Sequence, residues 1–439
     1  MISIPIGQGA RPAVILGPYA NRHGLICGAT GTGKTFTLAT LAEGFSRAGV
    51  PVFLCDVKGD LAGMARPGRG APAPVRFLDV YGVEGDRVRV PVRDFGAELL
   101  TRVLALSPVQ GEVLAAMFGA GGRLDTLGDL AARLAAPRHE FRATKASLDS
   151  IARALITFRQ SGADQFFGRP AFDVASLEAP QAGGAGLVTI LAAERLIRSP
   201  DLYGAFLLWL LGALYDRAPE IGDCSAPRLV LIFDEAHLIF RDASPALLRR
   251  IEQTVRLIRS KAIGVYFASQ APADIPPAIA AQLANRVQHA MRAATLADRR
   301  EIQGAADCLP INPKIRTAEL IATMATGTAL VSTLDASGRP TPVDVVRVNA
   351  PNGRLGTLTP GERAPFRLTG VEGVRGPSEG SPRTAPGLWG RVAGGLIVTA
   401  LSWLACAALH GSQWITAVIS AWMAWGVLYP GRATKGDPT

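Results

Sequence analysis

The chain has 439 residues, and its 48% hydrophobic and 19% charged residues allow a sizeable core and exclude a mostly disordered protein. Its formal net charge of +10 suits a polyanionic partner such as nucleic acid, although no run of five or more like charges occurs. Five cysteines lie far apart with no C-x-x-C pair, so neither a zinc site nor a disulfide framework is indicated.

The start of the chain, MISIPIGQGARPAVIL, lacks the basic residues and the long apolar stretch of a secretory signal. We therefore expect the main body of the protein to be cytoplasmic. Short apolar runs rich in β-branched residues then alternate with helical segments, which is the pattern of a parallel sheet covered by helices. Core strands are expected at residues 24–27, 51–56, 186–191, 229–233, 264–269 and 286–291.

The segment GATGTGKT, residues 28–35, matches G-x-x-x-x-G-K-[ST] directly after the first strand and before a helical segment. Its glycines allow the backbone to curl so that N–H groups point at phosphates, and the following helix adds the positive end of its dipole. Lys34 should reach the β- and γ-phosphates of ATP, and the Thr35 hydroxyl should bind Mg²⁺. The residues expected to contact the nucleotide are Gly28, Thr30, Gly31, Thr32, Gly33, Lys34, Thr35 and Phe36.

Between residues 94 and 180 the sequence changes character, because apolar residues recur at spacings of three and four, as in Leu148, Ile151 and Leu155. This pattern predicts a helical insertion at 94–180 that divides the nucleotide-binding core into residues 1–93 and 181–350. The insertion either adds only stability, as a lid, or helps to grip a substrate.

The apolar run at 229–233 ends in Asp234 and Glu235, so a buried strand delivers two carboxylates to the edge where ligands bind in open α/β sheets. Asp234 should hold the metal, and Glu235 should orient and deprotonate the attacking water. The letters DEAH at 234–237 also occur in a helicase superfamily that needs a second RecA-like domain. The stretch from Ala293 to Pro360 is too short for one, so another subunit must complete the site or it remains incomplete.

Two polar residues flank the strand expected at 264–269. Gln270 follows it and is positioned to sense the γ-phosphate; the alternative is a strand-end residue that binds the loop backbone. Arg259 precedes it, near the C-terminus of a helix, where the helix dipole stabilises cations. Arg259 either has only that local role or projects into a neighbouring subunit's ATP site, where it would stabilise the transition state.

The C-terminal part is different in composition. Residues 351–387 contain 14 Gly or Pro among 37 and predict a linker. Residues 388–430 form two apolar segments joined by HGSQ, with basic residues outside both ends. They predict an apolar helical hairpin that spans the membrane and anchors the ATPase body to the inner face of the cytoplasmic membrane. The alternative is a helix pair that packs on itself or in an oligomer interface.

Together these motifs resemble the HerA/FtsK class of ring-forming P-loop motors, and they are most similar to the HerA-like ATPases of the YjgR type. The resemblance covers residues 1 to about 360. It is carried by CGATGTGKTFTLATLAEGFSRAGVPVFLCDVKGDLAGMA, DQFFGRPAFD, FDEAHLIF, RIEQTVRLIRSKAIGVYFASQAPADIP and QLANRVQHAMRA.

The resemblance implies an α/β fold, a RecA-like P-loop NTPase core with a mostly parallel sheet and a helical insertion, assembled as hexamers around DNA. The C-terminal apolar helical hairpin would be an addition to it. By matching motifs, Lys34, Thr35, Asp234 and Glu235 fall on the hydrolytic positions. Gln270 falls on the γ-phosphate sensor and Arg259 on the arginine finger, with Arg292 as a second candidate.

The sequence therefore predicts an ATP- and Mg²⁺-dependent homo-oligomer, a hexamer, that translocates or remodels double-stranded DNA. Two alternatives stay open. One is a membrane-tethered ATPase that acts on protein substrates, and the other is a nucleotide-dependent scaffold that binds ATP and hardly hydrolyses it.

Overall fold

The computed structural model describes residues 2–135, 141, 143–179, 183–222, 224–241 and 245–367. They all belong to one compact unit, which spans Met1–Gly376. The apolar hairpin predicted at 388–430 lies outside the described residues. Among the helices that the structure describes, none is both long and apolar enough to cross a bilayer.

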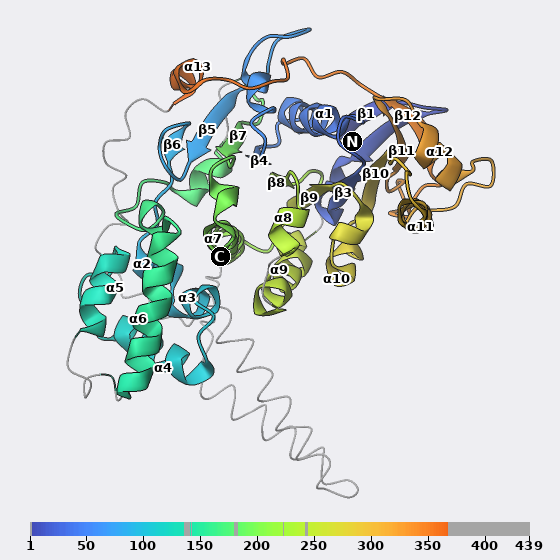
Figure 1. The fold of residues 1–439 in the computed structure, drawn as a ribbon. Coiled ribbons are helices and arrows are strands. Elements are labelled where there is room, and N and C mark those ends of the chain that lie inside the picture. Colours follow the sequence, from blue (N-terminus) through green and yellow to red (C-terminus); the bar gives the residue numbers. More distant parts are fainter. Residues whose placement is uncertain are drawn as a thin grey trace, which may run out of the picture. The chain divides into compact units, whose positions relative to one another are not determined.

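One sheet of 12 strands runs through the described part of the chain, in the order β2-β1-β12-β11-β10-β3-β9-β8-β4-β7-β5-β6 (Figure 1). The strands from β10 to β6 in this order are parallel to their neighbours, and the other four add an antiparallel edge. The predicted α/β fold with a mostly parallel sheet is thus confirmed. The strands are β1 (Ser3–Gln8), β2 (Pro12–Leu16), β3 (Gly24–Cys27), β4 (Val52–Asp56), β5 (Val75–Asp79), β6 (Asp86–Arg87), β7 (Val188–Ala192), β8 (Leu229–Phe233), β9 (Ile263–Ser269), β10 (Asn285–His289), β11 (Thr328–Ser332) and β12 (Asp344–Val348).

The central strands are buried on both faces, which is why they are continuous apolar runs in the sequence. In β8, Leu229, Leu231 and Phe233 pack into one core cluster. The alternate residues Val230 and Ile232 pack into a second cluster on the other face. All six predicted core strands are present, and each begins and ends within about two residues of its expected position.

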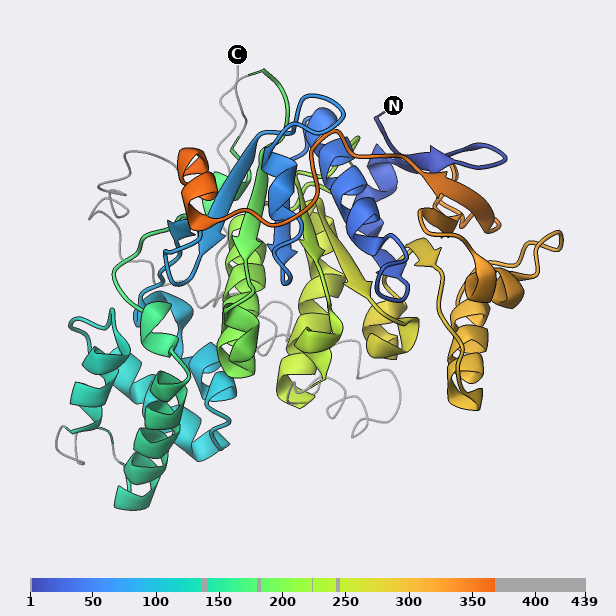
Figure 2. The ribbon, with the colours of Figure 1, turned by 45° about the horizontal axis from the view of Figure 1, so that its top comes forward.

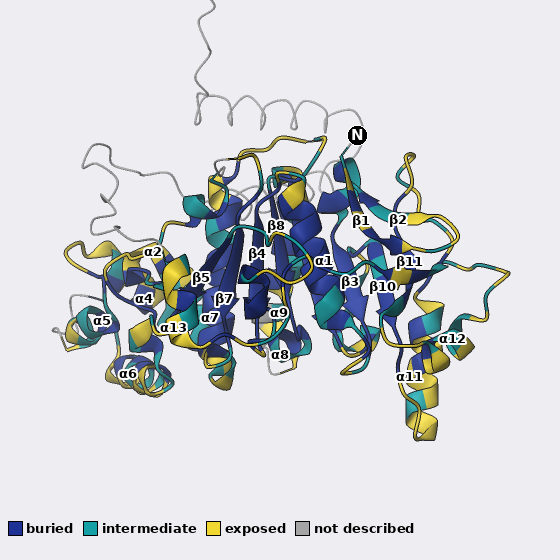
Figure 3. Cartoon of the chain, turned by 90° about the horizontal axis from the view of Figure 1, so that it is seen from above, coloured by how far each residue is buried: buried dark blue, intermediate teal, exposed yellow. Residues whose placement is uncertain are grey.

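Helix α1 packs against the second cluster, whereas α7 and α9 pack against the first. Figure 3 shows the central strands and α1 as buried, whereas the peripheral helices α6 and α11 carry many exposed residues. The helices are α1 (Lys34–Arg47), α2 (Val92–Phe95), α3 (Ala97–Val103), α4 (Pro108–Gly119), α5 (Leu127–Leu134), α6 (Lys145–Gln160), α7 (Pro200–Arg217), α8 (His237–Phe240), α9 (Pro245–Ile258), α10 (Pro277–Ala280), α11 (Leu296–Asp307), α12 (Thr317–Thr323) and α13 (Pro360–Arg363).

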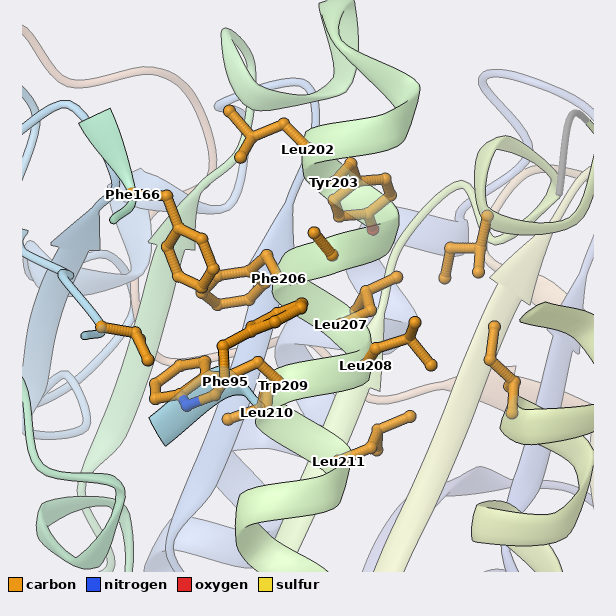
Figure 4. Packing of buried hydrophobic residues seen from close by; sticks show 14 of the residues in the cluster. Phe95, Phe166, Leu202, Tyr203, Phe206, Leu207, Leu208, Trp209, Leu210 and Leu211 are labelled. Atoms are coloured by element: carbon orange, nitrogen blue, oxygen red, sulfur yellow. The ribbon is translucent and has the colours of Figure 1, made fainter. Parts of the chain in front are cut away.

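Helices α2 to α6 lie between β6 and β7 in the chain; α3 to α6 lie within the segment predicted as a helical insertion, and α2 begins two residues before it. Figure 4 shows Phe95 and Phe166 of this segment beside Phe206 and Trp209 of α7. The Phe166 ring lies 5.9 Å from the Phe206 ring and 5.7 Å from that of Trp209, both in edge-to-face arrangements. The helical segment therefore shares a core with the sheet through α7, while the division at 94 and 180 stays a prediction.

Residues 351–367 run back across the α1 face of the sheet to α13, beside β5 (Figure 2). The buried Arg363 guanidinium forms ion pairs with Glu84 (3.4 Å) and Glu194 (3.0 Å), and Phe366 packs edge-on against Phe77. These contacts hold residues 351–367 against the sheet, and the linker at 351–387 stays a prediction. Composition indicated chain breakers, but side-chain anchors hold the irregular backbone on the sheet.

Candidate nucleotide-binding site

The site lies at one edge of the sheet because β3, β9, β8 and β4 are parallel neighbours whose carboxyl ends meet there. The P-loop, residues 28–33, follows β3, and Gln270 follows β9. Asp234 and Glu235 follow β8, and Asp56 ends β4. The fold thus brings the two predicted halves of the site together, with β9 between them.

The P-loop backbone has the shape that its glycines permit. Gly28, Gly31 and Gly33 all have positive φ angles, of 149°, 78° and 119°. A Cβ atom at Gly28 would lie 2.5 Å from the Cβ of His289, whereas one at Gly31 would meet no described atom within 4 Å. Gly28 is therefore required for space as well as for conformation, and Gly31 for conformation alone.

Neighbouring loops hold the P-loop in place. The Gly28 N–H donates to the Gln270 carbonyl (3.1 Å) and the Ala29 N–H to the Ala290 carbonyl (2.9 Å). The Gly327 N–H donates to the Thr32 carbonyl (3.1 Å). Hydrogen bonds from three neighbouring segments thus fix the backbone of the P-loop.

Helix α1 begins at Lys34, and its N-cap residue Gly33 supplies no side-chain hydrogen bond. The first amide to find a helical acceptor is that of Thr37, on the Gly33 carbonyl (3.0 Å). The N–H groups of Lys34, Thr35 and Phe36 come before this ladder and are available to an anion at the helix N-terminus.

The Lys34 side chain is 5% exposed and donates from Nζ to the Gly28 carbonyl at 2.6 Å. Burial lowers its pKa below that of an ordinary lysine, and the nearby Glu235 carboxylate partly offsets this. A buried ammonium group that donates to a neutral carbonyl is suited to exchange that contact for a phosphate oxygen.

Three oxygen-bearing side chains beside Lys34 fit a Mg²⁺ ion. The Thr35 hydroxyl donates to Asp60 Oδ2 (3.1 Å), while Asp60 Oδ1 and Asp234 Oδ2 are buried and find no hydrogen-bond partner among the described residues. Burial and the adjacent Glu235 raise the pKa of Asp234 to about 6, a cost that a cation would relieve. No group of three or more His, Cys, Asp or Glu side chains within the described residues could hold a metal alone, so phosphate oxygens would complete the coordination.

Glu235 is 3% exposed and lies on a backbone with a φ of 46°, a conformation that few non-glycine residues adopt. Its carboxylate forms an ion pair with Lys58 and lies 3.2 Å from His237 Nδ1. Burial would raise its pKa, but the Lys58 ammonium outweighs that effect, so the pKa of Glu235 lies below its ordinary value. Glu235 is therefore ionised, as a general base must be.

Lys58, Asp60 and Asp56 belong to the site, although the sequence reasoning did not select them. Asp56 is the last residue of β4, and Lys58 and Asp60 lie in the loop that follows it. The shape of this loop is set by Asp56, which accepts from the N–H groups of Gly59 (2.8 Å) and Leu61 (3.1 Å). Burial and then the Glu194 and Asp60 carboxylates raise the pKa of Asp56 to about 8. A signal was present, because VFLCD is an apolar run that ends in a carboxylate, as LVLIFD is.

The two candidate arginines lie at opposite ends of the parallel strands: Arg292 follows the carboxyl end of β10, and Arg259 precedes the amino end of β9. Arg292 is exposed and comes two residues after Ala290, which binds the P-loop. Arg259 is exposed and precedes β9, whose seven residues extend over roughly 23 Å, so its side chain cannot reach the P-loop of its own chain. Gln270 is exposed beside the P-loop, and the catalytic roles of all three residues stay predictions.

No curated protein matches the chain in sequence. The solved structures that share its fold include three examples: the bacterial conjugative coupling protein TrwBdeltaN70 (TM-score 0.56, 14% identity, covering 81% of this chain and 92% of that one), VirB4 of Thermoanaerobacter pseudethanolicus (0.54, 16%, 80% and 96%), and TrwB in complex with ADP and Mg²⁺ (0.53, 14%, 78% and 88%). A model of the family "Helicase HerA-like C-terminal" matches residues 3–73 and 70–376. The predicted HerA/FtsK-class resemblance is thereby confirmed, and the chain belongs to the HerA-like C-terminal helicase family.

Proposed function

We propose that the protein is a Mg²⁺-dependent ATPase that works as a homo-hexameric ring and moves or remodels double-stranded DNA. The observation that carries the ATPase assignment is the meeting of the P-loop with Asp234 and Glu235 at one sheet edge. The similar structure of TrwB in complex with ADP and Mg²⁺ supports the choice of ligands. The DNA assignment is supported by the family's helicase description and by the net charge of +10.

Each site residue would have a defined part in hydrolysis. Lys34 and the first N–H groups of α1 would bind the phosphates. Thr35, Asp234 and Asp60 would supply oxygen ligands to Mg²⁺. Bound Mg²⁺ would neutralise charge on the β- and γ-phosphates. Glu235 accepts a proton from water as its oxygen attacks the γ-phosphorus, and the bond to the β–γ bridging oxygen breaks with its electron pair leaving on ADP.

The position of Arg259 favours a ring. An arginine that stabilises the transition-state charge must approach the γ-phosphate, and Arg259 cannot do so within its own chain. In a head-to-tail ring, the face of one subunit that carries Arg259 would meet the next subunit's P-loop edge.

The experiment that tests this function is an ATPase assay with and without linear duplex DNA. We expect DNA to raise the turnover rate, and the stimulation to decline between roughly 50 and 200 mM salt as counterion release becomes less favourable. A rate that is indifferent to DNA at every salt concentration would favour the protein-remodelling ATPase. Negligible turnover under all conditions would favour the scaffold.

We further propose that the body is cytoplasmic and is tethered to the membrane by residues 388–430. Full-length protein should sediment with membranes and resist high-salt extraction, because apolar burial is not screened by salt. Removing residues 388–439 should release a soluble ATPase. If the full-length protein is soluble without detergent and the deletion instead disrupts the oligomer, these residues form an assembly interface.

A further inference from the structure

A cleft of about 510 Å³ opens directly beside the P-loop. Its lining includes Gly33 and Phe36 of the P-loop and helix α1, together with Gln8, Arg69, Arg347 and Asn349. This volume falls within the roughly 300–1,000 Å³ range of small-molecule sites. The cleft borders the phosphate-binding backbone, yet none of the catalytic carboxylates lines it.

The sheet order fixes which part of a nucleotide this cleft would face. Strand β8, with Asp234 and Glu235, lies on one side of the P-loop strand β3, and β12, with Arg347, lies on the other. A triphosphate whose γ-phosphate approaches Glu235 must therefore extend its other end away from β8. Phe36, the third residue of α1, lines the same cleft as Arg347 of β12, on the side away from β8.

The walls of the cleft are anchored on helix α1, which also carries the P-loop lysine. Thr40 donates to the Asn349 carbonyl (2.7 Å), and the Glu43 carboxylate accepts from the N–H groups of Asn352 and Gly353 (both 2.7 Å). The Asn352 carbonyl in turn accepts from the Arg69 N–H (2.8 Å). These hydrogen bonds therefore fix the position of the cleft walls relative to helix α1 and the P-loop.

Arg69 and Arg347 give the cleft its chemistry. Both are exposed, and within the described part of the chain neither guanidinium has an ion pair or a hydrogen bond. A planar guanidinium stacks on an aromatic ring and donates in a fixed fork to ring nitrogens, carbonyls and hydroxyls. Because the partly buried Phe36 also lines the cleft, the cleft offers two planar donors and an aromatic side chain.

We propose that this cleft binds the base and ribose of the nucleotide, and that Arg69 and Arg347 are its principal contacts. The assignment rests on the proposed ATPase function, since it presumes that the triphosphate lies on the P-loop. It adds a recognition site on β12 and on the loop that follows β4, outside the P-loop itself.

The test compares nucleotides with the same phosphate chain lacking a nucleoside. Mg²⁺-dependent binding of ATP, ADP and inorganic tripolyphosphate would be measured for the full-length protein and for Arg69→Ala, Arg347→Ala and Lys34→Ala. We expect each cleft variant to weaken ATP and ADP by about tenfold and to change tripolyphosphate affinity by less than about twofold. Lys34→Ala should weaken ATP and tripolyphosphate alike.

Arg11→Ala is the matched control, because it removes an equal charge from an exposed arginine near the β1–β2 turn, outside the cleft. Arg347→Lys keeps the charge and should recover only part of the affinity if the planar fork matters. Unchanged ATP affinity in both cleft variants, with unaltered melting temperatures, would overturn the proposal. So would an equal loss for tripolyphosphate, which would make the cleft a phosphate site. Failure of Lys34→Ala to weaken either ligand would instead overturn the proposed function.

Discussion

Replacing Lys34 with Ala should weaken ATP binding by about 10- to 100-fold, because charged hydrogen bonds contribute roughly 1.5–3 kcal/mol. The side chain is almost fully buried at the P-loop, where its ammonium group donates to the Gly28 carbonyl. The measurement is equilibrium binding of ATP and ADP. Hydrolysis at saturating ATP should also fall, since the lysine neutralises charge that develops on the γ-phosphate.

Glu235→Gln should have the opposite signature in the same assays. Turnover should fall by roughly 10²- to 10⁴-fold, because the amide cannot accept the proton of the attacking water. ATP affinity should be unchanged or higher, because a carboxylate close to Lys34 and Lys58 is removed while the shape is kept. Lys58 is 39% exposed, so solvent can accommodate its lost ion pair.

Glu301→Gln, at an exposed position on α11, is the control and should change neither quantity. If Lys34→Ala and Glu235→Gln lose nucleotide affinity equally, the division into a binding lysine and a catalytic carboxylate is incorrect. If the Glu235→Gln protein keeps full turnover, another residue of the site is the general base.

Arg259→Ala should reduce turnover by about 10³- to 10⁵-fold, the range for an arginine that stabilises phosphoryl-transfer charge. ATP affinity should change little, because in its own subunit Arg259 lies at the amino end of β9, whereas the P-loop lies at the carboxyl ends of the strands. Arg256→Ala is the matched control, since Arg256 lies one turn earlier in α9 and is paired with Glu252 at 2.8 Å. That variant should keep its activity.

Mixing tests whether Arg259 acts in trans. Arg259→Ala subunits keep Glu235, and Glu235→Gln subunits keep Arg259. In randomly mixed rings of equal parts, about one quarter of interfaces would pair an intact Glu235 with an intact Arg259. Activity should therefore partly return when the two inactive proteins exchange subunits. If no mixture recovers activity while exchange is demonstrated, Arg259 is not the finger, and Arg292 becomes the arginine to test.

The buried parallel strands could be predicted from the sequence because burial on both faces requires continuous apolar runs. Leu229–Phe233 is the clearest example, and its following carboxylates were found with it. The antiparallel edge was missed because three of its strands, β1, β2 and β12, mix buried residues with exposed or half-buried ones. In β12, Asp344–Val348, exposed and buried residues are mixed, and no run of apolar letters marks it.

The candidate site divides in the same way. The P-loop and Asp234–Glu235 are contiguous motifs, so their chemistry can be seen in the letters alone. The pairing of Lys58 with Glu235 joins residues far apart in the chain, and only the adjacency of β4 and β8 makes it possible. The positive φ of Glu235 and the packing of His289 beneath Gly28 are likewise products of tertiary structure.

The pairing of β1 with β12 has a consequence for how the protein is made. Gly7 lies opposite Val348 and Gln8 opposite Arg347, so β1 pairs with a strand of the sheet that is synthesised more than 330 residues later. At synthesis rates of about 5–20 residues per second, β1 must wait roughly 17–70 s for this partner. The P-loop strand also waits, because both its neighbours, β9 and β10, come more than 230 residues later. Nascent chains that stop before Asp344 would leave the edges of β1 and β11 open to pairing with other chains, so premature termination should yield aggregates rather than a smaller ATPase.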